Sequence, residues 1–184
     1  MRAEVAMKLT CPRMSASMAD GMGHTYYQNY GHLIYHVYSV ELLTEDLPRV
    51  HAYMRAVLKG VGVKNPVVGG IEDHIHIFGE FPVKLAVSDV VRQVKTSTTS
   101  WLKTTRAAYK RFAWQEGFAY FSVSASLYDR TARYVITQRE HHANKSFEQE
   151  LDDIIARCNN AIHVSFRDAP DELHPHPRRQ ARKY

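Results

Sequence analysis

The sequence predicts an α+β protein in which a four-stranded antiparallel sheet carries helices packed on one face. Segments rich in β-branched and aromatic residues alternate with segments whose apolar residues recur at helical spacing. The order of these segments along the chain is strand, helix, strand, strand, helix, strand, helix, helix. This order indicates a split βαβ arrangement followed by two further helices.

Each element has a local justification. Four segments have the composition of strands: residues 32–40, 67–71, 74–81 and 117–124. Four segments have an amphipathic helical pattern: residues 44–60, 88–103, 127–142 and 146–157. A residue that can cap a helix stands at or just before the start of each helical segment, and these residues are Thr44, Ser88, Ser126 and Ser146. Ser126 and Ser146 are each followed three residues later by a residue that can complete a capping box.

Length and composition predict one globular domain flanked by tails. The chain has 184 residues, of which 45% are hydrophobic and 23% charged, which excludes a disordered protein. We expect an N-terminal extension over residues 1–29, a folded domain over residues 30–166 and a basic flexible tail over residues 167–184. No apolar run reaches the length of a membrane span, and no secretory signal is visible. Two cysteines are too few for a disulfide scaffold, so we expect a cytoplasmic protein.

The most informative motif is His74-Ile75-His76 within a predicted strand. Residues two apart on a strand point to the same face, so both imidazoles should lie side by side and Ile75 should point into the core. Two neighbouring imidazoles with an open front suit a metal ion that also holds a substrate. Half-exposed histidines with no ligand role are the alternative interpretation of this motif by itself.

A second motif lies on the predicted helix after the fourth strand. Tyr134 and Gln138 are four residues apart, so they share a helix face. Combined with His74 and His76, the amide oxygen of Gln138 completes a set of three metal ligands. Tyr134 would then be a phenolic nucleophile one turn away, and a divalent ion could offset the weak reactivity of a protonated tyrosine. Attack on a phosphodiester would leave a covalent phosphotyrosine, from which a DNA strand can be rejoined.

The net charge of +5 favours a polyanionic partner. Between residues 90 and 115 there are six basic residues and no acidic one. The six candidate DNA-binding residues are Arg92, Lys95, Lys103, Arg106, Lys110 and Arg111. Four aromatic residues, Trp101, Tyr109, Phe112 and Trp114, are interleaved and could stack on unpaired bases. A solvated basic face with its aromatic residues in the core is an equally good interpretation.

The chain resembles the single-tyrosine HUH transposases of the smallest bacterial insertion sequences, the 200/605 type, including their REP-associated relatives. Five blocks carry the resemblance in family order and at family spacing: residues 69–76, 87–95 with 100–101, 112–118 with 121–124, 134–142, and 147–151. The resemblance covers about residues 30–157. It implies a ferredoxin-like fold and a homodimer.

The same resemblance implies the chemistry. Family members use Mg²⁺ or Mn²⁺ to nick single-stranded DNA, and they leave a 5′-phosphotyrosine and a free 3′-hydroxyl. By position, His74, His76 and Gln138 correspond to the metal ligands and Tyr134 to the nucleophile. The family recognises DNA hairpins at the ends of the element. Its tyrosine helix can complete the site of a partner subunit, so composite active sites are compatible with the resemblance.

Several alternatives stay open at the level of sequence. A domesticated or inactive module of the same fold would bind hairpin DNA without cutting it, and a phosphodiesterase would use water in place of Tyr134. His141 and His142 follow Tyr134 on the same predicted helix and can either approach the site or complement the helix dipole. Asp73 can orient an imidazole or belong only to the turn.

Overall fold

The computed structural model describes residues 26–142 and 146–167, with the side chains described up to residue 159. Except for Arg167, the tail expected over residues 167–184 lies outside the described residues, as does most of the extension expected over residues 1–29. Among the described helices, none is both long and apolar enough to span a bilayer.

The sheet has four strands in the order β2-β3-β1-β4, and every neighbouring pair is antiparallel. The strands are β1 (Tyr30–His36), β2 (Lys64–Gly70), β3 (His74–Glu80) and β4 (Ala119–Ser122). Helix α1 (Leu47–Gly60) connects β1 to β2, and α2 (Val87–Thr105) connects β3 to β4. Each connection skips one strand, which gives two split βαβ units. The predicted α+β fold class is confirmed.

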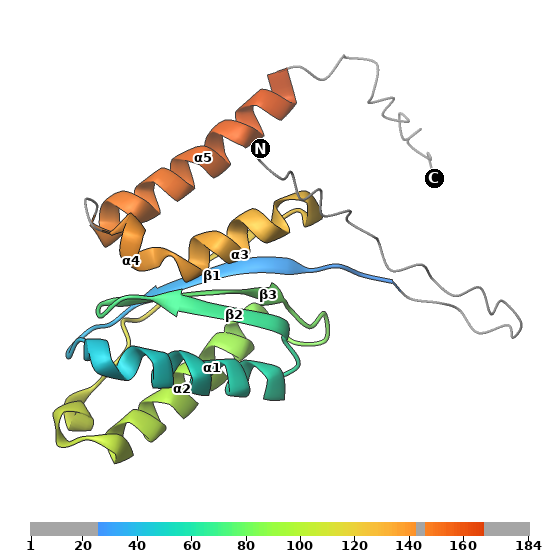
Figure 1. The fold of residues 1–184 in the computed structure, drawn as a ribbon. Coiled ribbons are helices and arrows are strands. Elements are labelled where there is room, and N and C mark those ends of the chain that lie inside the picture. The colour runs from blue at the N-terminus through green and yellow to red at the C-terminus, as the bar shows by residue number, and fades with distance from the viewer. Residues whose placement is uncertain (1–25, 143–145, 168–184) are drawn as a thin grey trace, which may run out of the picture.

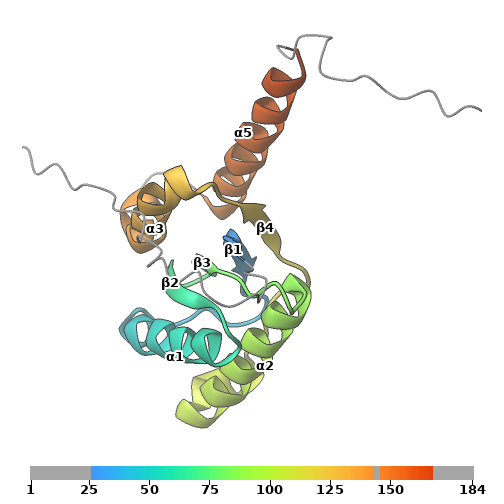
Figure 2. The same ribbon diagram turned by 90° about the vertical axis from the view of Figure 1, so that its right-hand side faces the viewer.

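The helices cover both faces of the sheet, whereas the sequence predicted helices on one face only (Figures 1 and 2). Helices α1 and α2 lie on one face. Helices α3 (Tyr128–Ile136), α4 (Gln138–His141) and α5 (Phe147–Arg167) lie on the other, and α3 contacts β2 and β3. The expectation was wrong because the split βαβ units account for α1 and α2 alone. The sequence predicted an open face at His74 and His76, but the last three helices cover that face.

Strand alternation divides the side chains between the two faces. Leu33, Ile75 and Ile77 point toward α1 and α2 and are fully buried in the main hydrophobic core. His32, His74 and His76 are offset by an odd number of residues from these core positions and therefore point to the opposite face. The apolar core thus holds a rigid sheet, and the opposite face presents polar side chains to α3, α4 and α5.

Glycine at position 69 allows the backbone of α3 to approach the sheet. A Cβ at Gly69 would lie 1.7 Å from the carbonyl oxygen of Val135, which is far inside any allowed contact. Its neighbour Gly70 has a φ of +135°, which L-residues with side chains rarely adopt, and leads into the turn before β3. The glycine pair therefore serves both the close packing of α3 and the turn that presents the histidines.

The helix predicted over residues 127–142 is divided in two. After a short 3₁₀ turn, η3 (Ala125–Leu127), α3 ends at Ile136, and α4 begins at Gln138. The Thr137 hydroxyl donates a hydrogen bond of 3.0 Å to the carbonyl oxygen of Arg133, a type of contact that bends helices. Beyond the break, α4 contacts β2 and leads toward α5 (Figure 1).

Only one of the four predicted caps is observed with its side chain in place. The Ser146 hydroxyl accepts a bond from the Gln149 amide, and the Gln149 side chain accepts one from the Ser146 amide, so this capping box is confirmed. No side-chain cap is present at the starts of α1, α2 and α3. A 3₁₀ turn, η1 (Thr44–Asp46), precedes α1, and another, η2 (Ala107–Arg111), follows α2.

Candidate active site

Strand β3 places His74 and His76 side by side on the sheet face covered by α3, α4 and α5. Their backbone partners on β1 are His36 and Ile34. Both imidazole side chains are completely buried, so the open front expected from the sequence is absent. Ile75 points into the main core as predicted. The front is closed because α4 and α5 contribute polar side chains directly above the two rings.

Each of the two imidazoles has a partner that fixes its ring. Asp73 Oδ1 lies 2.6 Å from His74 Nδ1, and His32 Nε2 lies 2.9 Å from His76 Nδ1. Both contacts use Nδ1 and leave Nε2 directed at the site. A neighbouring carboxylate or imidazole of this kind sets the tautomer and orientation of a metal-ligating histidine.

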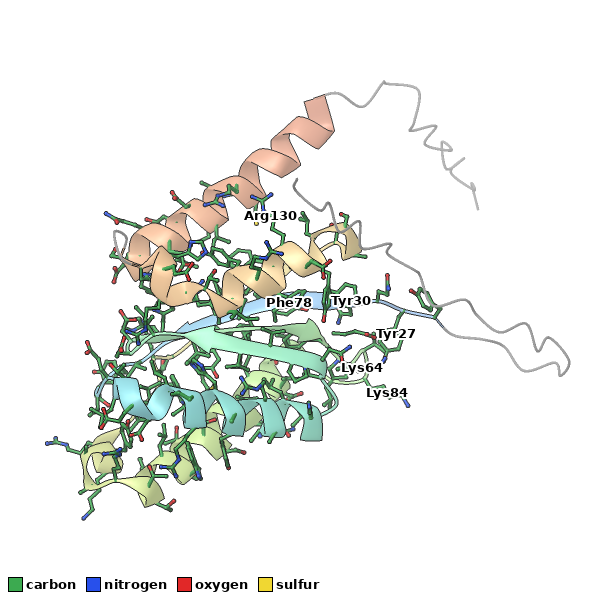
Figure 3. The ribbon with its side chains drawn as sticks, in the orientation of Figure 1. Tyr27, Tyr30, Lys64, Phe78, Lys84 and Arg130 are labelled. Carbon is green, nitrogen blue, oxygen red and sulfur yellow. The ribbon has the colours of Figure 1, made fainter. Side chains whose placement is uncertain are left out.

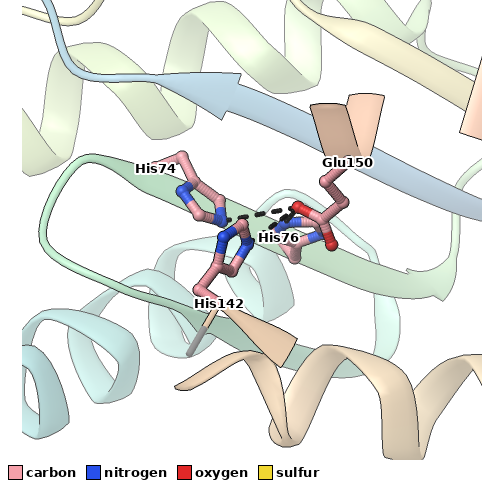
Figure 4. A group of neighbouring side chains, drawn as sticks. All are labelled: His74, His76, His142 and Glu150. Atoms are coloured by element: carbon pink, nitrogen blue, oxygen red, sulfur yellow. Dashed lines mark hydrogen bonds and ion pairs between the residues drawn. The ribbon is translucent and has the colours of Figure 1, made fainter. Parts of the chain in front are cut away.

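Side chains from α4, from α5 and from the residue that follows α4 cover the histidine pair. Figure 4 shows two of them, Glu150 and His142. Gln138 Oε1 lies 3.4 Å from His74 Nε2, and the amide of Gln138 is buried. The Glu150 carboxylate on α5 is also buried. One of its oxygens lies 3.2 Å from His76, 3.7 Å from His74 and 2.9 Å from His142, in each case measured to Nε2. Glu150 is therefore the point at which the three imidazoles meet.

Tyr134 on α3 reaches the same cluster. Its hydroxyl donates a hydrogen bond to the second carboxylate oxygen of Glu150, and its ring lies 5.9 Å from the His76 ring, centroid to centroid. Gln138 donates a hydrogen bond of 3.2 Å to the Tyr134 carbonyl oxygen. The break at Thr137 thus leaves Tyr134 and Gln138 on the same side, as the spacing predicted, and brings both next to the histidine pair.

Burial and the contacts among these groups control their protonation. It lowers the pKa of His76 to about 4 and that of His32 to about 3, so both imidazoles are neutral at pH 7 and carry the lone pairs that metal ions require. Burial and then the hydrogen bond to Glu150 raise the pKa of Tyr134. Burial also acts to raise the pKa of Glu150, but contact with His76 outweighs it and the net pKa lies well below its usual range. The site therefore contains a carboxylate and a protonated phenol.

The donor set fits a divalent metal ion. Ligand atoms of His74, His76, His142 and Glu150 all lie within 4.8 Å of one another. His76 Nε2 is buried and has no hydrogen bond of good geometry within the described residues, despite the nearby carboxylate. A buried imidazole nitrogen with a free lone pair is a favourable ligand, and a carboxylate beside two imidazoles suits Mn²⁺ as well as other divalent ions.

Sequence reasoning missed Glu150 and the part played by His32 and His142. The carboxylate is 74 residues from His76 in the chain, and its position in an amphipathic helix is typical of an ordinary surface residue. His142 joins the cluster, whereas His141 lies outside it and packs against the Tyr134 ring at 4.7 Å. The capping box at Ser146 was the one sequence signal for the position of Glu150. It fixes where α5 begins and therefore places Glu150 one turn into the helix.

The basic stretch lies away from this cluster, on α2 and η2. Arg106 binds the buried Asp46 through two contacts of 2.8 and 3.1 Å. Lys95 donates to the carbonyl oxygens of Gln115 and Gly117. Arg92 pairs with Asp89 at 3.1 Å across the exposed surface. The remaining three residues of the set are exposed: Lys103, Lys110 and Arg111.

The aromatic residues of this stretch pack inside the protein. Tyr109, Phe112 and Trp114 belong to the main core. Trp101 is half-buried and stacks on Tyr53 with a centroid distance of 4.5 Å. Between the two interpretations of this segment, the structure favours a basic helix face whose aromatic residues are in the core.

Comparison with known proteins identifies the family. The model of the family described as "Transposase IS200 like" matches residues 25–138, which is more than half of the chain. The chain therefore belongs to the IS200-like transposases, and the predicted resemblance is confirmed. Comparison with curated proteins gives no match.

Two solved structures are similar to this chain. One is a crystal structure of a protein from Deinococcus radiodurans R1 described as a transposase, with 17% identity, a TM-score of 0.48, and coverage of 64% of this chain and 95% of that one. The other is a REP-associated tyrosine transposase bound to a REP hairpin, with 15% identity, a TM-score of 0.43, and coverage of 62% and 70%.

Proposed function

We propose that this transposase nicks and rejoins single-stranded DNA through a 5′-phosphotyrosine on Tyr134, with Mg²⁺ or Mn²⁺ as cofactor. The observation that carries the proposal is the shared carboxylate: Glu150 accepts the Tyr134 hydrogen bond with one oxygen and faces His74 and His76 with the other. A candidate nucleophile and a candidate metal centre are thus joined by one side chain.

His74, His76 and Gln138 are the proposed metal ligands, and Glu150 and His142 supply further donors within reach. A bound divalent ion would polarise the scissile phosphate and stabilise the charge that develops on it. Asp73 and His32 hold the two imidazoles in orientation. An amide, a carboxylate and neutral imidazoles together suit Mn²⁺ at least as well as Mg²⁺, which prefers oxygen ligands.

The protein side of the reaction concerns one proton and one bond exchange. The Tyr134 oxygen forms a bond to phosphorus while the bond from phosphorus to the 3′-oxygen breaks. Glu150 accepts the hydrogen bond of the phenol and so orients the Tyr134 oxygen in the site. Net, the proton passes from the phenol to the departing 3′-oxygen. Because one phosphoester replaces another, the reverse reaction rejoins the strand without a separate energy source.

We further propose that hairpin DNA binds the exposed cations of the basic stretch, which are Arg92, Lys103, Lys110 and Arg111. Cations on one surface neutralise phosphates without reading sequence. Arg106 and Lys95 belong to the same predicted set. Arg106 binds the buried Asp46 and Lys95 binds two backbone carbonyl oxygens, whereas the partner of Arg92 is the exposed Asp89. A homodimer is part of the proposal, and light scattering of the purified chain tests it.

A covalent-adduct assay tests the function. The full chain is incubated with labelled single-stranded hairpin DNA and Mn²⁺, and the products are separated on a denaturing protein gel. A protein–DNA adduct that disappears in Tyr134→Phe supports the proposal. Cleavage that survives Tyr134→Phe supports a phosphodiesterase that uses water, and binding without cleavage supports a hairpin-binding module.

The variant His76→Ala separates metal chemistry from DNA binding. It removes a buried imidazole on the sheet face opposite α2, so we expect loss of the adduct with hairpin affinity unchanged. Thermal unfolding of the variant checks that it remains folded. Loss of both activities in a folded His76→Ala protein would contradict the separation of the two sites.

A further inference from the structure

A cleft runs from Tyr134 to the surface between α3, β4 and α5. Its volume is about 850 Å³, and its walls include His32, Tyr134 and Glu150 at the candidate active site. Phe121 and Val123, on β4 and just beyond it, line the side formed by the edge of the sheet. Any chain that reaches the Tyr134 hydroxyl through this cleft must pass these walls.

Positively charged side chains outnumber negatively charged ones along the cleft. Its lining includes Arg130, Arg133 and Arg157, against Asp129 and Glu150, and Arg157 lies 3.9 Å from Asp153 of the same helix. Glu150 is buried and engaged by the histidines and Tyr134. Arg130 and Arg133 are exposed and pair with no carboxylate in the described part of the chain. Even with the exposed Asp129, the outer part of the cleft therefore carries more positive than negative side chains, and Arg130 extends from α3 into the space beside α5 (Figure 3).

Apolar surface accompanies these cations. Phe121 is half-buried, and its ring lies 6.3 Å from that of His32. Leu127 and Ile154 also line the cleft, and 45% of the surface of Leu127 is exposed. Cationic groups that follow a backbone, combined with aromatic and apolar surface for bases, are the features of single-strand binding sites. A duplex would not enter, because a volume of about 850 Å³ is of the size that holds small ligands.

We propose that the single strand cut by Tyr134 lies in this cleft, with its phosphates on Arg130, Arg133 and Arg157. The inference rests on the proposed function, since it takes Tyr134 as the reacting group. The surface with Arg92 and Lys103 adjoins the other end of the same edge strand, where residues 112–118 line a hollow of about 600 Å³. A hairpin bound there could continue past β4 as a single strand into the cleft.

Two double variants that each remove two positive charges test the proposal. Arg130→Gln/Arg133→Gln changes the cleft, and Lys59→Gln/Lys84→Gln changes two exposed cations elsewhere. Fluorescence anisotropy measures binding of a labelled oligothymidylate, which forms no hairpin, to the full chain at several salt concentrations. We expect the cleft variant to bind about tenfold more weakly. The slope of log affinity against log salt should become shallower by about 1.4, since each lost phosphate contact accounts for about 0.7. The control variant should stay close to the unchanged protein.

Equal affinities for the cleft variant and the unchanged protein, or equal losses in both variants, would overturn the proposal. The adduct assay keeps this outcome distinct from failure of the proposed function. A Tyr134-dependent adduct together with unchanged affinity in the cleft variant would support the proposed function and contradict strand binding in the cleft. If the protein forms no adduct and the cleft variant binds more weakly, the proposed function is contradicted and strand binding in the cleft is supported.

Discussion

The Tyr134 hydroxyl and His76 Nε2 contact opposite oxygens of a single carboxylate, that of Glu150. Sixteen residues separate Glu150 from Tyr134 in the chain, and the two lie on different helices. The carboxylate links the phenol to the imidazole cluster, so its charge acts on both. It raises the pKa of the phenol in addition to the effect of burial, and it adds a negative charge where a cation would bind.

Glu150→Gln should weaken metal binding. Glutamine keeps the shape of the side chain and removes its charge, so we expect the dissociation constant for Mn²⁺ to rise by roughly 10–100-fold. The pKa of Tyr134 should fall because the neighbouring negative charge is gone. Isothermal titration calorimetry measures the first effect, and the ultraviolet absorbance of tyrosinate measures the second. Glu148→Gln, an exposed carboxylate on the same helix, is the matched control, and an equal loss of Mn²⁺ affinity in both variants would contradict the assignment.

Mixing two inactive variants should not restore the adduct. Tyr134 lies beside His76 of the same chain, so we expect each active site to be formed by one chain. Every chain in the mixture lacks one of the two residues, and none of them can therefore form a complete site. His76→Ala and Tyr134→Phe are mixed, refolded together and assayed on hairpin DNA. An adduct in the mixture, absent from either variant alone, would show that Tyr134 acts on the metal centre of a partner subunit.

Gly69→Ala should destabilise the fold and displace α3. The added Cβ would meet the Val135 carbonyl oxygen, which is a backbone atom and cannot move aside without moving the helix that carries Tyr134. We expect a loss of at least about 2 kcal/mol in the free energy of unfolding, together with loss of adduct formation. Gly60→Ala is the control, because nothing lies within 4 Å of its added Cβ. Equal stability of the two variants in urea unfolding would contradict the close approach of α3.

Strand and helix periodicity were enough to predict the fold class, since the order of the elements determines the split βαβ units. Local spacing also predicted that His74 and His76 share one face of β3. It predicted in the same way that Tyr134 and Gln138 lie on the same side. The position of Glu150 did not follow, because it depends on how α5 packs across the sheet. Tertiary packing of this kind leaves no periodic signal in the sequence.

The division of helices between the two faces was also beyond local reasoning. Histidines on a strand predict an open side of the sheet, since polar residues commonly face solvent. Here the Nδ1 atoms of His74 and His76 have partners in Asp73 and His32, and the Glu150 carboxylate faces their Nε2 atoms, so helices can cover them. The aromatic residues of the basic stretch were also beyond prediction from the sequence. Composition alone does not distinguish rings that lie in the core from rings that are exposed to solvent.

Arg106→Gln should affect stability more than DNA affinity. The Arg106 guanidinium binds Asp46, whose buried carboxylate also accepts a hydrogen bond of 2.8 Å from the Tyr109 hydroxyl. Removing the guanidinium leaves that carboxylate without its cation, so the Tm should fall. Arg111→Gln is the control because Arg111 is exposed, and it should reduce hairpin affinity with little change in Tm. The reverse pattern in thermal unfolding and anisotropy would show that Arg106 serves DNA binding.

His51 on α1 should make the protein less stable in mild acid. Burial, and then the charge of Arg55, lowers the pKa of His51 to about 4, and its Nε2 has no hydrogen-bond partner within the described residues. Between pH 6.5 and 4 the unfolded chain binds a proton at this position and the folded chain does not, so stability is full above pH 6.5 and falls as the pH drops. His51→Leu removes this effect while every other histidine is retained. The stability of the variant relative to the unchanged protein should therefore improve by up to about 2 kcal/mol from pH 7 to pH 5. Urea unfolding at the two pH values measures the change, and a difference that is the same at both would show that His51 titrates normally in the folded protein.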